Sequence, residues 1–116
     1  MFRTITLLSA LAASPVTATE FTRVTDADTF RQIVTGKSLT RPLIRLQVSP
    51  QGAIEGRGGT QPVSGQWAWK DGYFCRDLTW GQRDLGYNCQ EVRTNGRKIR
   101  FRSDKGTGDF ADFTLR

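Results

Sequence analysis

Residues 65–80 read GQWAWKDGYFCRDLTW, and apolar and polar side chains alternate on both sides of Asp71 and Gly72. Such alternation is typical of β-strands, and Asp-Gly is a preferred dipeptide of the type I′ turn that joins two strands in a hairpin. The stretch therefore predicts an antiparallel hairpin in which Trp67 faces Arg76.

The same pattern extends through the rest of the chain, where turn residues recur at intervals of roughly 8–12 residues. Seven strands are predicted, over residues 43–48, 53–56, 63–70, 73–80, 87–94, 97–103 and 110–115. A second hairpin is predicted at Asn95-Gly96, pairing Val92 with Ile99, Gln90 with Phe101, and Glu91 with Arg100. The predicted fold is mainly β, a small antiparallel barrel or sandwich.

Residues 25–36 predict one short N-terminal helix, the only helix of the chain. Thr25 or Asp26 can cap its first turn, and Gly36 can end it in a left-handed conformation. Its apolar face, with the spacing i, i+3, i+4, consists of Phe30, Ile33 and Val34. Because the helix is short, packing against the strands has to stabilise it.

Alternation assigns the strand side chains to two faces. The core face carries Trp67, Trp69, Phe74, Leu78, Trp80, Val92, Ile99 and Phe101. The opposite face carries Tyr73, Cys75, Asp77, Tyr87, Cys89, Glu91, Arg93, Lys98, Arg100 and Arg102. Both cysteines of the chain lie on this second face, so a Cys75–Cys89 disulfide is predicted, which is the usual use of cysteine in small exported domains.

The N-terminus resembles a secretory signal peptide. A short positive start that includes Arg3 precedes a mostly apolar run over residues 5–13, and small residues lead to Ala18. The apolar run is too short for a membrane span, which needs roughly 20 residues. We therefore expect a signal peptide over residues 1–18, a single β-rich domain over residues 19–116, and a periplasmic or secreted protein.

The composition excludes several kinds of chemistry. The 116 residues include 17 Lys and Arg, 11 Asp and Glu, and no His, which gives a net charge of +6. Without histidine, a Ser-His-Asp triad, a Cys-His pair and a His-rich zinc site are all excluded. The spacing of Asp104, Asp109 and Asp112 matches no calcium loop, so neither a metal nor a cofactor is predicted.

Arg76 is the one charged residue on the predicted core face, and it has two interpretations. Its guanidinium can stack on Trp67, or its apolar stem can pack beneath a solvated head. Alternatively, the interior of the fold is a ligand cavity in which Arg76 binds an anion. The sequence does not decide whether such a cavity exists.

Basic residues gather on the second hairpin, at Arg93, Arg97, Lys98, Arg100 and Arg102. This stripe is either a solvated, charged edge or a site for an acidic ligand, a glycan, a lipid headgroup or an acidic envelope protein. Arg100 and Arg102 are its candidate binding residues, and Tyr73 and Tyr87 are the most accessible aromatic candidates. The predicted Glu91–Arg100 pair and export both argue against nucleic acid.

The stretch from Gly65 to Leu115, with its segments GQWAWKDGYFCRDLTW, GYNCQ and NGRKIRFRSDKGTGD, resembles a group of short exported proteins of alphaproteobacteria without an assigned function. Some of these bear the name dihydrodipicolinate reductase, which implies a nicotinamide-dependent enzyme. The sequence lacks the Gly-rich strand–loop–helix fingerprint of such enzymes, so it does not support that name.

A looser resemblance is to small periplasmic β-barrel inhibitors. Gly65-Gln66-Trp67, Cys75 and a single disulfide are similar to inhibitors of bacterial metalloproteases. The size, the predicted barrel and the disulfide resemble inhibitors of lysozyme, although their Ser-Gly-x-x-Tyr loop is absent. An inhibitory loop would be expected at residues 81–86 or 104–109.

The sequence thus predicts a monomeric, exported module without a membrane span that binds a small or acidic ligand or blocks an envelope enzyme. The alternative is an enzyme in which Asp or Glu performs acid–base chemistry. Asp77 and Asp84, which recur in two Arg-Asp-Leu triplets, are the carboxylates that such an enzyme could use.

Overall fold

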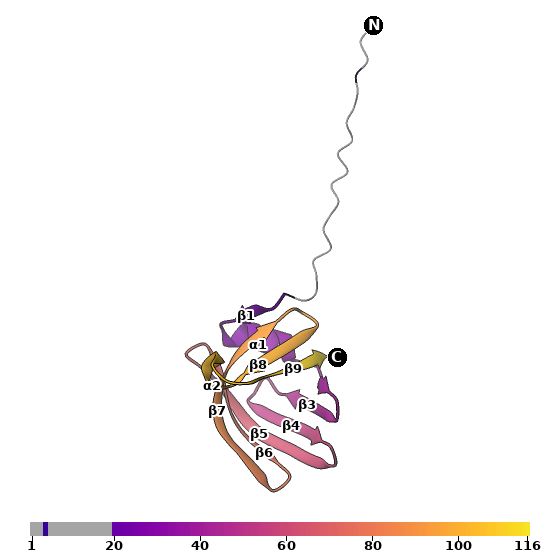
Figure 1. Cartoon of the computed structure of the whole chain (residues 1–116), viewed down its shortest axis with the longest axis vertical. Coiled ribbons are helices and arrows are strands. Elements are labelled where there is room, and N and C mark those ends of the chain that lie inside the picture. The colour runs from indigo at the N-terminus through magenta and orange to yellow at the C-terminus, as the bar shows by residue number, and fades with distance from the viewer. Residues whose placement is uncertain (1–3, 5–19) are drawn as a thin grey trace.

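The computed structural model describes Thr4 and residues 20–116, and its fold is mainly β (Figure 1). The predicted signal peptide, residues 1–18, lies outside the described residues apart from Thr4. The elements are β1 (Thr22–Val24), α1 (Ala27–Val34), β2 (Leu39–Arg41), β3 (Ile44–Val48), β4 (Ala53–Gly58), β5 (Gln61–Lys70), β6 (Tyr73–Trp80), β7 (Arg83–Thr94), β8 (Lys98–Arg102), α2 (Ser103–Gly106) and β9 (Phe110–Leu115).

Eight of these strands close into an antiparallel barrel. Neighbours follow the order β7-β6-β5-β4-β3-β2-β9-β8, and β8 pairs with β7 to complete the ring. The ninth strand, β1, pairs with the end of β7, where Val24 is the register partner of Val92. Of the two architectures that the sequence leaves open, the structure therefore adopts the barrel.

All seven predicted strands are present, with different bounds at some ends. The two additional strands, β1 and β2, have three residues each, which is too short for alternation to identify them. The prediction of a loop over residues 81–86 is wrong, because only Gly81 and Gln82 form the turn and β7 begins at Arg83. The predicted loop over residues 104–109 contains most of the additional short helix, α2.

The register of the first hairpin is confirmed, since Trp67 pairs with Arg76 across β5 and β6. The predicted register of the second hairpin is wrong by two residues. The observed partners are Glu91 with Arg102, Val92 with Phe101, Arg93 with Arg100, and Thr94 with Ile99. The cause is a longer turn, in which the Asn95 side chain accepts hydrogen bonds from the backbone N–H groups of Arg97 and Lys98. A shift of two residues leaves every side chain on its predicted face.

Helix α1 occupies the predicted position but is shorter than expected. The carboxylate of Asp26 accepts a hydrogen bond of 3.0 Å from the backbone N–H of Thr29, which makes Asp26 the N-cap. This bond and one from the Thr29 hydroxyl hold the pKa of Asp26 below its ordinary value. The helix ends at Val34, and Gly36 follows with a φ of 72°, as expected for a left-handed C-terminal residue.

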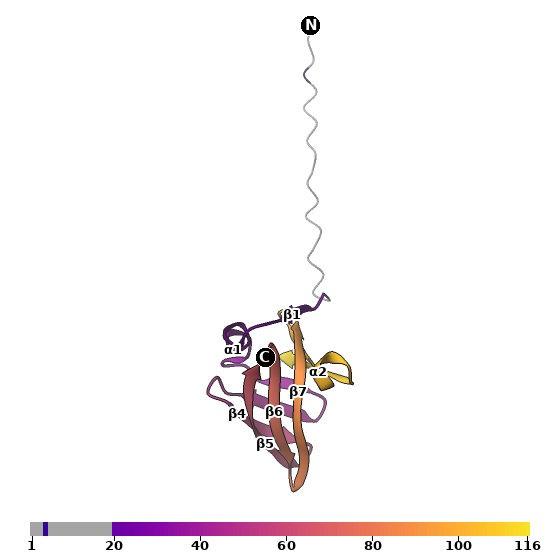
Figure 2. The same ribbon diagram turned by 90° about the vertical axis from the view of Figure 1, so that its left-hand side faces the viewer.

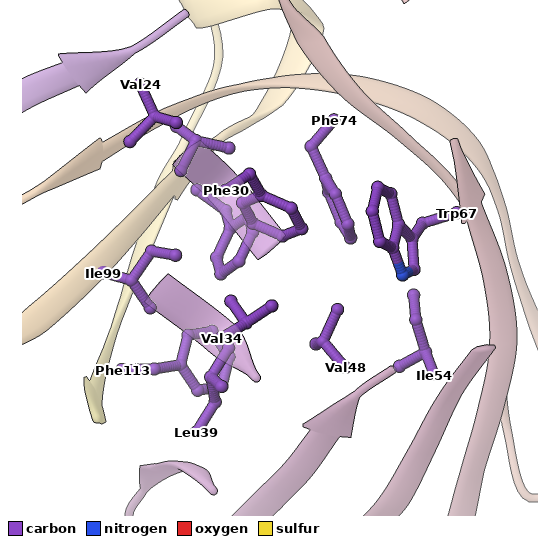
Figure 3. Packing of buried hydrophobic residues seen from close by; sticks show 12 residues of the cluster. Val24, Phe30, Val34, Leu39, Val48, Ile54, Trp67, Phe74, Ile99 and Phe113 are labelled. Carbon is purple, nitrogen blue, oxygen red and sulfur yellow. The ribbon is translucent and has the colours of Figure 1, made fainter. Parts of the chain in front are cut away.

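One end of the barrel is filled by α1, while the β6–β7 hairpin extends from the other end (Figures 1 and 2). Phe30 and Val34 project from α1 into the interior (Figure 3) and are fully buried. The ring of Phe30 lies 5.0 Å from that of Trp67 and 5.1 Å from that of Phe74. Aromatic pairs at such distances stabilise the core beyond the area that they bury.

Most of the predicted core residues are buried, but Trp80 is not. It lies at the tip of the β6–β7 hairpin, and 39% of it is exposed. Its indole N–H donates to the carbonyl oxygen of Gly58 over 2.8 Å, so the ring spans β5 and reaches the end of β4. The prediction that Trp80 belongs to the core is therefore wrong, because strand alternation does not show where the interior ends.

The predicted disulfide is confirmed. Cys75 and Cys89 are register partners on β6 and β7 and are joined by a disulfide. Cys75 is almost completely buried, with 2% exposed. The bridge ties together two strands that are already paired, and it therefore fixes their register as well as closing a loop.

We predict that Phe30→Ala destabilises the protein by about 3–5 kcal/mol, because it removes the largest fully buried side chain and leaves a cavity among aromatic rings. Urea unfolding followed by tryptophan fluorescence would measure the change. The matched control is Phe110→Ala, whose ring is 49% exposed, and it should cost much less. Equal losses in the two variants would contradict the assigned role of Phe30.

We predict that replacing both Cys75 and Cys89 by Ser lowers the free energy of unfolding by about 2–5 kcal/mol. The disulfide restricts the unfolded chain over 14 positions of sequence separation, and its loss restores that conformational entropy. Denaturation midpoints of the oxidised wild type and the double variant give the comparison. Identical midpoints with identical slopes would show that the bridge is not structural.

Candidate binding cavity in the barrel

The barrel contains a cavity of about 290 Å³ in the part that α1 does not fill. Strands β2, β3, β4, β6, β7, β8 and β9 all contribute to its wall, and most of the side chains are aliphatic or aromatic. The inward-facing Leu46 and Leu78 pack against the buried core but are only half-buried, because they also border the cavity. For comparison, a cavity of about 150 Å³ accommodates benzene.

The wall of the cavity includes exposed residues at the start of β9. Asp109 and Phe110 both contribute to its wall and are both exposed. The remaining polar groups of the wall are Arg76 of β6, Gln90 of β7 and Ser103 of α2. An apolar cavity with a few polar groups on its wall is the usual form of a small-molecule site.

Arg76 is half-buried, and it contributes the only Lys or Arg side chain of the cavity wall among the described residues. One guanidinium nitrogen donates to the carbonyl oxygen of Gly86 over 2.7 Å. Within residues 20–116 no carboxylate lies within ion-pair distance of Arg76. Burial lowers the pKa of the guanidinium, and the negative charge of Asp77 partly opposes this shift. The group stays protonated at neutral pH, so the cavity holds a positive charge without a paired carboxylate.

A β-bulge places the carbonyl that Arg76 contacts. The pairing of β6 with β7 shifts between Leu78 and Thr79, so that Leu85 is an extra residue on β7. Gly86, directly after it, has a φ of 78°, and its N–H donates to the Asp84 carboxylate over 2.8 Å. The carbonyl of Gly86 can then accept from Arg76 on the inward side.

Helix α2 closes the side of the cavity next to β7. The Asn88 side chain donates to the carboxylate of Asp104 over 2.8 Å and accepts from the N–H of the same residue over 3.0 Å. The side-chain amide of Gln90 donates to the Ser103 hydroxyl over 3.3 Å. Asp104 and Lys105 both have left-handed backbone angles, with φ near 55°, and these contacts hold that unfavourable conformation in place.

The candidate residues Arg100 and Arg102 lie outside the barrel. Arg100 donates two hydrogen bonds, of 2.7 and 2.9 Å, to the carboxylate of Asp112 on β9. Its guanidinium also lies 4.2 Å from the ring centres of both Phe21 and Phe110. Arg102 lies 4.8 Å from the ring of Phe110 on the same surface. Arg100 is therefore already satisfied by protein partners.

The predicted pair between Glu91 and Arg100 is wrong. Glu91 makes its ion pair with Arg93 on its own strand, and the hydrogen bonds from Arg100 hold the pKa of Asp112 below its ordinary value of 3.8. The same hydrogen bonds raise the pKa of Arg100. The two-residue register shift explains the change of partner, because it places Glu91 opposite Arg102.

The two candidate tyrosines are also on the outer surface and do not line the cavity. Tyr87 is 57% exposed, and the ammonium of Lys70 lies 5.8 Å from its ring centre. Tyr73 is half-buried, with the guanidinium of Arg23 5.0 Å and the ammonium of Lys105 5.7 Å from its ring centre. Of the five predicted binding residues, Arg76 alone contributes to the cavity wall.

The carboxylates considered for acid–base chemistry are not in the cavity either. Asp77 faces Tyr87 on the outside of the barrel, and Asp84 accepts from the backbone of its own hairpin. Among the described residues no group of three His, Cys, Asp or Glu side chains is arranged to hold a metal ion. No helix in residues 20–116 has the length and apolar character needed to cross a membrane.

Sequence reasoning did not identify Gln90 as a site residue, although a signal was present. Alternation places Asn88 and Gln90 on the same inward face as Arg76, where three polar side chains are unexpected.

No family model, curated protein or solved structure matches this chain, so its function has to be inferred from the geometry.

We predict that Asp112→Asn lowers stability by about 0.5–1 kcal/mol at neutral pH, since the pair with Arg100 is partly exposed. Because the pKa of Asp112 is lowered in the folded state, the contribution of the pair is complete above about pH 4 and is lost as the pH falls through the lowered value. The variant should therefore lose less stability than the wild type on acidification.

Urea unfolding at about pH 7 and about pH 3 measures this difference. The control is Asp28→Asn, because Asp28 pairs with Arg31 while 90% of its side chain is exposed. That substitution should change stability little at either pH. The assignment would be contradicted if the difference between Asp112→Asn and the wild type were the same at both values.

Proposed function

We propose that this protein is an exported binding module that holds a small amphipathic anion, such as a medium-chain carboxylate, inside its barrel. The apolar chain would occupy the cavity and the anionic head would pair with Arg76. The observation that carries the proposal is a half-buried guanidinium on the wall of an apolar cavity, with a single backbone carbonyl as its hydrogen-bond acceptor.

The free energy of burying a charge supports this proposal. A desolvated guanidinium is unfavourable unless a counter-charge or several hydrogen bonds compensate it. Arg76 uses one of its donors on Gly86, so other donors are available to a carboxylate, which a guanidinium can bind through two parallel hydrogen bonds. An anion in the cavity would supply the missing charge, and an apolar tail would displace water from the surrounding leucine and phenylalanine side chains.

The size and position of the site also fit a small ligand. The cavity is close to the lower limit of about 300 Å³ that is typical of ligand pockets. Phe110 of the wall lies beside Arg100, which is paired with Asp112, and beside Arg102, which has no ion-pair partner among the described residues and adds positive charge there. Such charge would attract an anion from solution. In this proposal Arg102 would contribute to the approach to Arg76, whereas Arg100 is engaged by Asp112.

We predict that decanoate binds the wild-type protein and that Arg76→Gln weakens this binding about tenfold or more, because a charged hydrogen bond is lost. Isothermal titration calorimetry would measure both affinities. Glutamine removes a half-buried charge and keeps a polar amide at this position, so the variant should be about as stable as the wild type. Weaker binding therefore would not reflect unfolding.

Two controls make the experiment specific. Arg97→Gln removes the same charge at an exposed position and should leave decanoate affinity unchanged. Decyltrimethylammonium has a similar tail and a positive head, and it should bind the wild type much more weakly. The proposal fails if the cation and the anion bind equally, or if Arg76→Gln binds decanoate as tightly as the wild type.

A further inference from the structure

The end of the barrel opposite α1 carries a row of three hairpin turns (Figures 1 and 2). They lie at residues 42–43, 59–60 and 81–82. Backbone hydrogen bonds hold the row together: the N–H of Gly59 donates to the carbonyl of Leu43 over 2.7 Å, and the N–H of Gly81 donates to the carbonyl of Pro62 over 2.8 Å. We call this region the hairpin-tip surface and define it by Leu43, Arg45, Arg57, Trp80, Arg83 and Leu85.

Three large apolar side chains of this surface are exposed. The exposed fractions are 84% for Leu43, 41% for Leu85 and 39% for Trp80. Leu43 is also in an unfavourable conformation, because its φ of 66° belongs to the left-handed region where Gly or Asn is preferred. The Leu43 side chain therefore adds little packing to the fold, which favours a role for it outside the fold.

The charged residues of the surface are arginines without acidic partners. Arg45 and Arg57 are register partners on β3 and β4, and like charges in this position destabilise a strand pair. Neither they nor Arg83 make an ion pair with any carboxylate of residues 20–116. The strands of these hairpins also carry four acids, Glu55, Asp77, Asp84 and Glu91. Asp84 accepts from the N–H of Gly86, and Glu91 pairs with Arg93.

The arrangement combines two requirements for binding to a lipid surface. Trp and Leu side chains enter the boundary between headgroups and acyl chains, and nearby cations interact with anionic headgroups. A hollow of about 390 Å³ beside Trp80, formed by Gln61, Trp80, Gly81, Gln82 and Arg83, can receive one such headgroup. An anionic headgroup would also relieve the repulsion between Arg45 and Arg57.

We propose that the hairpin-tip surface docks the protein on an anionic lipid bilayer. Leu43, Trp80 and Leu85 enter the interface, while Arg45, Arg57 and Arg83 bind phosphate groups. A bilayer is the expected partner because its flat array of negatively charged headgroups can bind several arginines at once. It is independent of the proposed function, because neither Arg76 nor the cavity takes part in it.

The test is co-sedimentation of the full chain with vesicles of phosphatidylglycerol and phosphatidylcholine in equal parts, compared with phosphatidylcholine alone. We expect binding only to the anionic vesicles, with an affinity that falls as salt is added. Arg45→Gln combined with Arg57→Gln should lower the partition coefficient about thirtyfold. Leu43→Asn should lower it about tenfold, and because Asn tolerates left-handed angles, this variant should not lose stability.

The matched control is Arg97→Gln combined with Lys98→Gln, which removes the same charge on the β7–β8 hairpin. Its partition coefficient should stay close to that of the wild type. The proposal is overturned if the wild type does not bind anionic vesicles, if it binds neutral ones equally well, or if the control loses as much affinity as the Arg45 and Arg57 variant. The same variants are also titrated with decanoate. An unchanged decanoate affinity would show that a loss of vesicle binding does not arise from the cavity.

Discussion

The packing of Phe30 against the aromatic residues of the barrel is the contact on which the rest of the structure depends. An eight-stranded barrel has an interior just wide enough to be filled by side chains. Here α1 fills one part of it, since Phe30 contacts Trp67, Trp69, Phe74 and Phe101. The part of the interior that α1 does not fill stays open as the cavity, with Phe74 and Phe101 bordering both.

Much of the fold could be predicted from local signals. The Asp71-Gly72 turn predicted the correct register of β5 and β6, because the turn has the two residues that this dipeptide favours. Alternation then placed Cys75 and Cys89 on one face, which predicted the disulfide between them. Asn95-Gly96 is an equally strong dipeptide signal, yet the side chain of Asn95 accepts two backbone hydrogen bonds and lengthens the turn. Closure of the barrel was not predictable, because it depends on short strands and on pairs between distant segments such as β2 and β9.

The site was predictable only in part, and Arg76 and Arg100 show why. Both were candidates because of their charge, but the difference between them lies in their surroundings. Arg100 is matched by Asp112, which comes from a strand paired to its own. Arg76 faces apolar side chains from several strands and one carbonyl that a bulge presents. Sequence alternation indicates that a side chain points inward, but not whether the space in front of it is filled.

The disulfide has a consequence for the wall of the cavity. Each cysteine immediately precedes a residue of the cavity wall, since Arg76 follows Cys75 and Gln90 follows Cys89. Covalent closure at this point adds to the β6–β7 ladder in opposing any slip of the two strands beside Arg76 and Gln90. In a reducing compartment hydrogen bonds and core packing alone would hold this part of the wall. The oxidation state of the two cysteines therefore bears directly on how firmly the site is held.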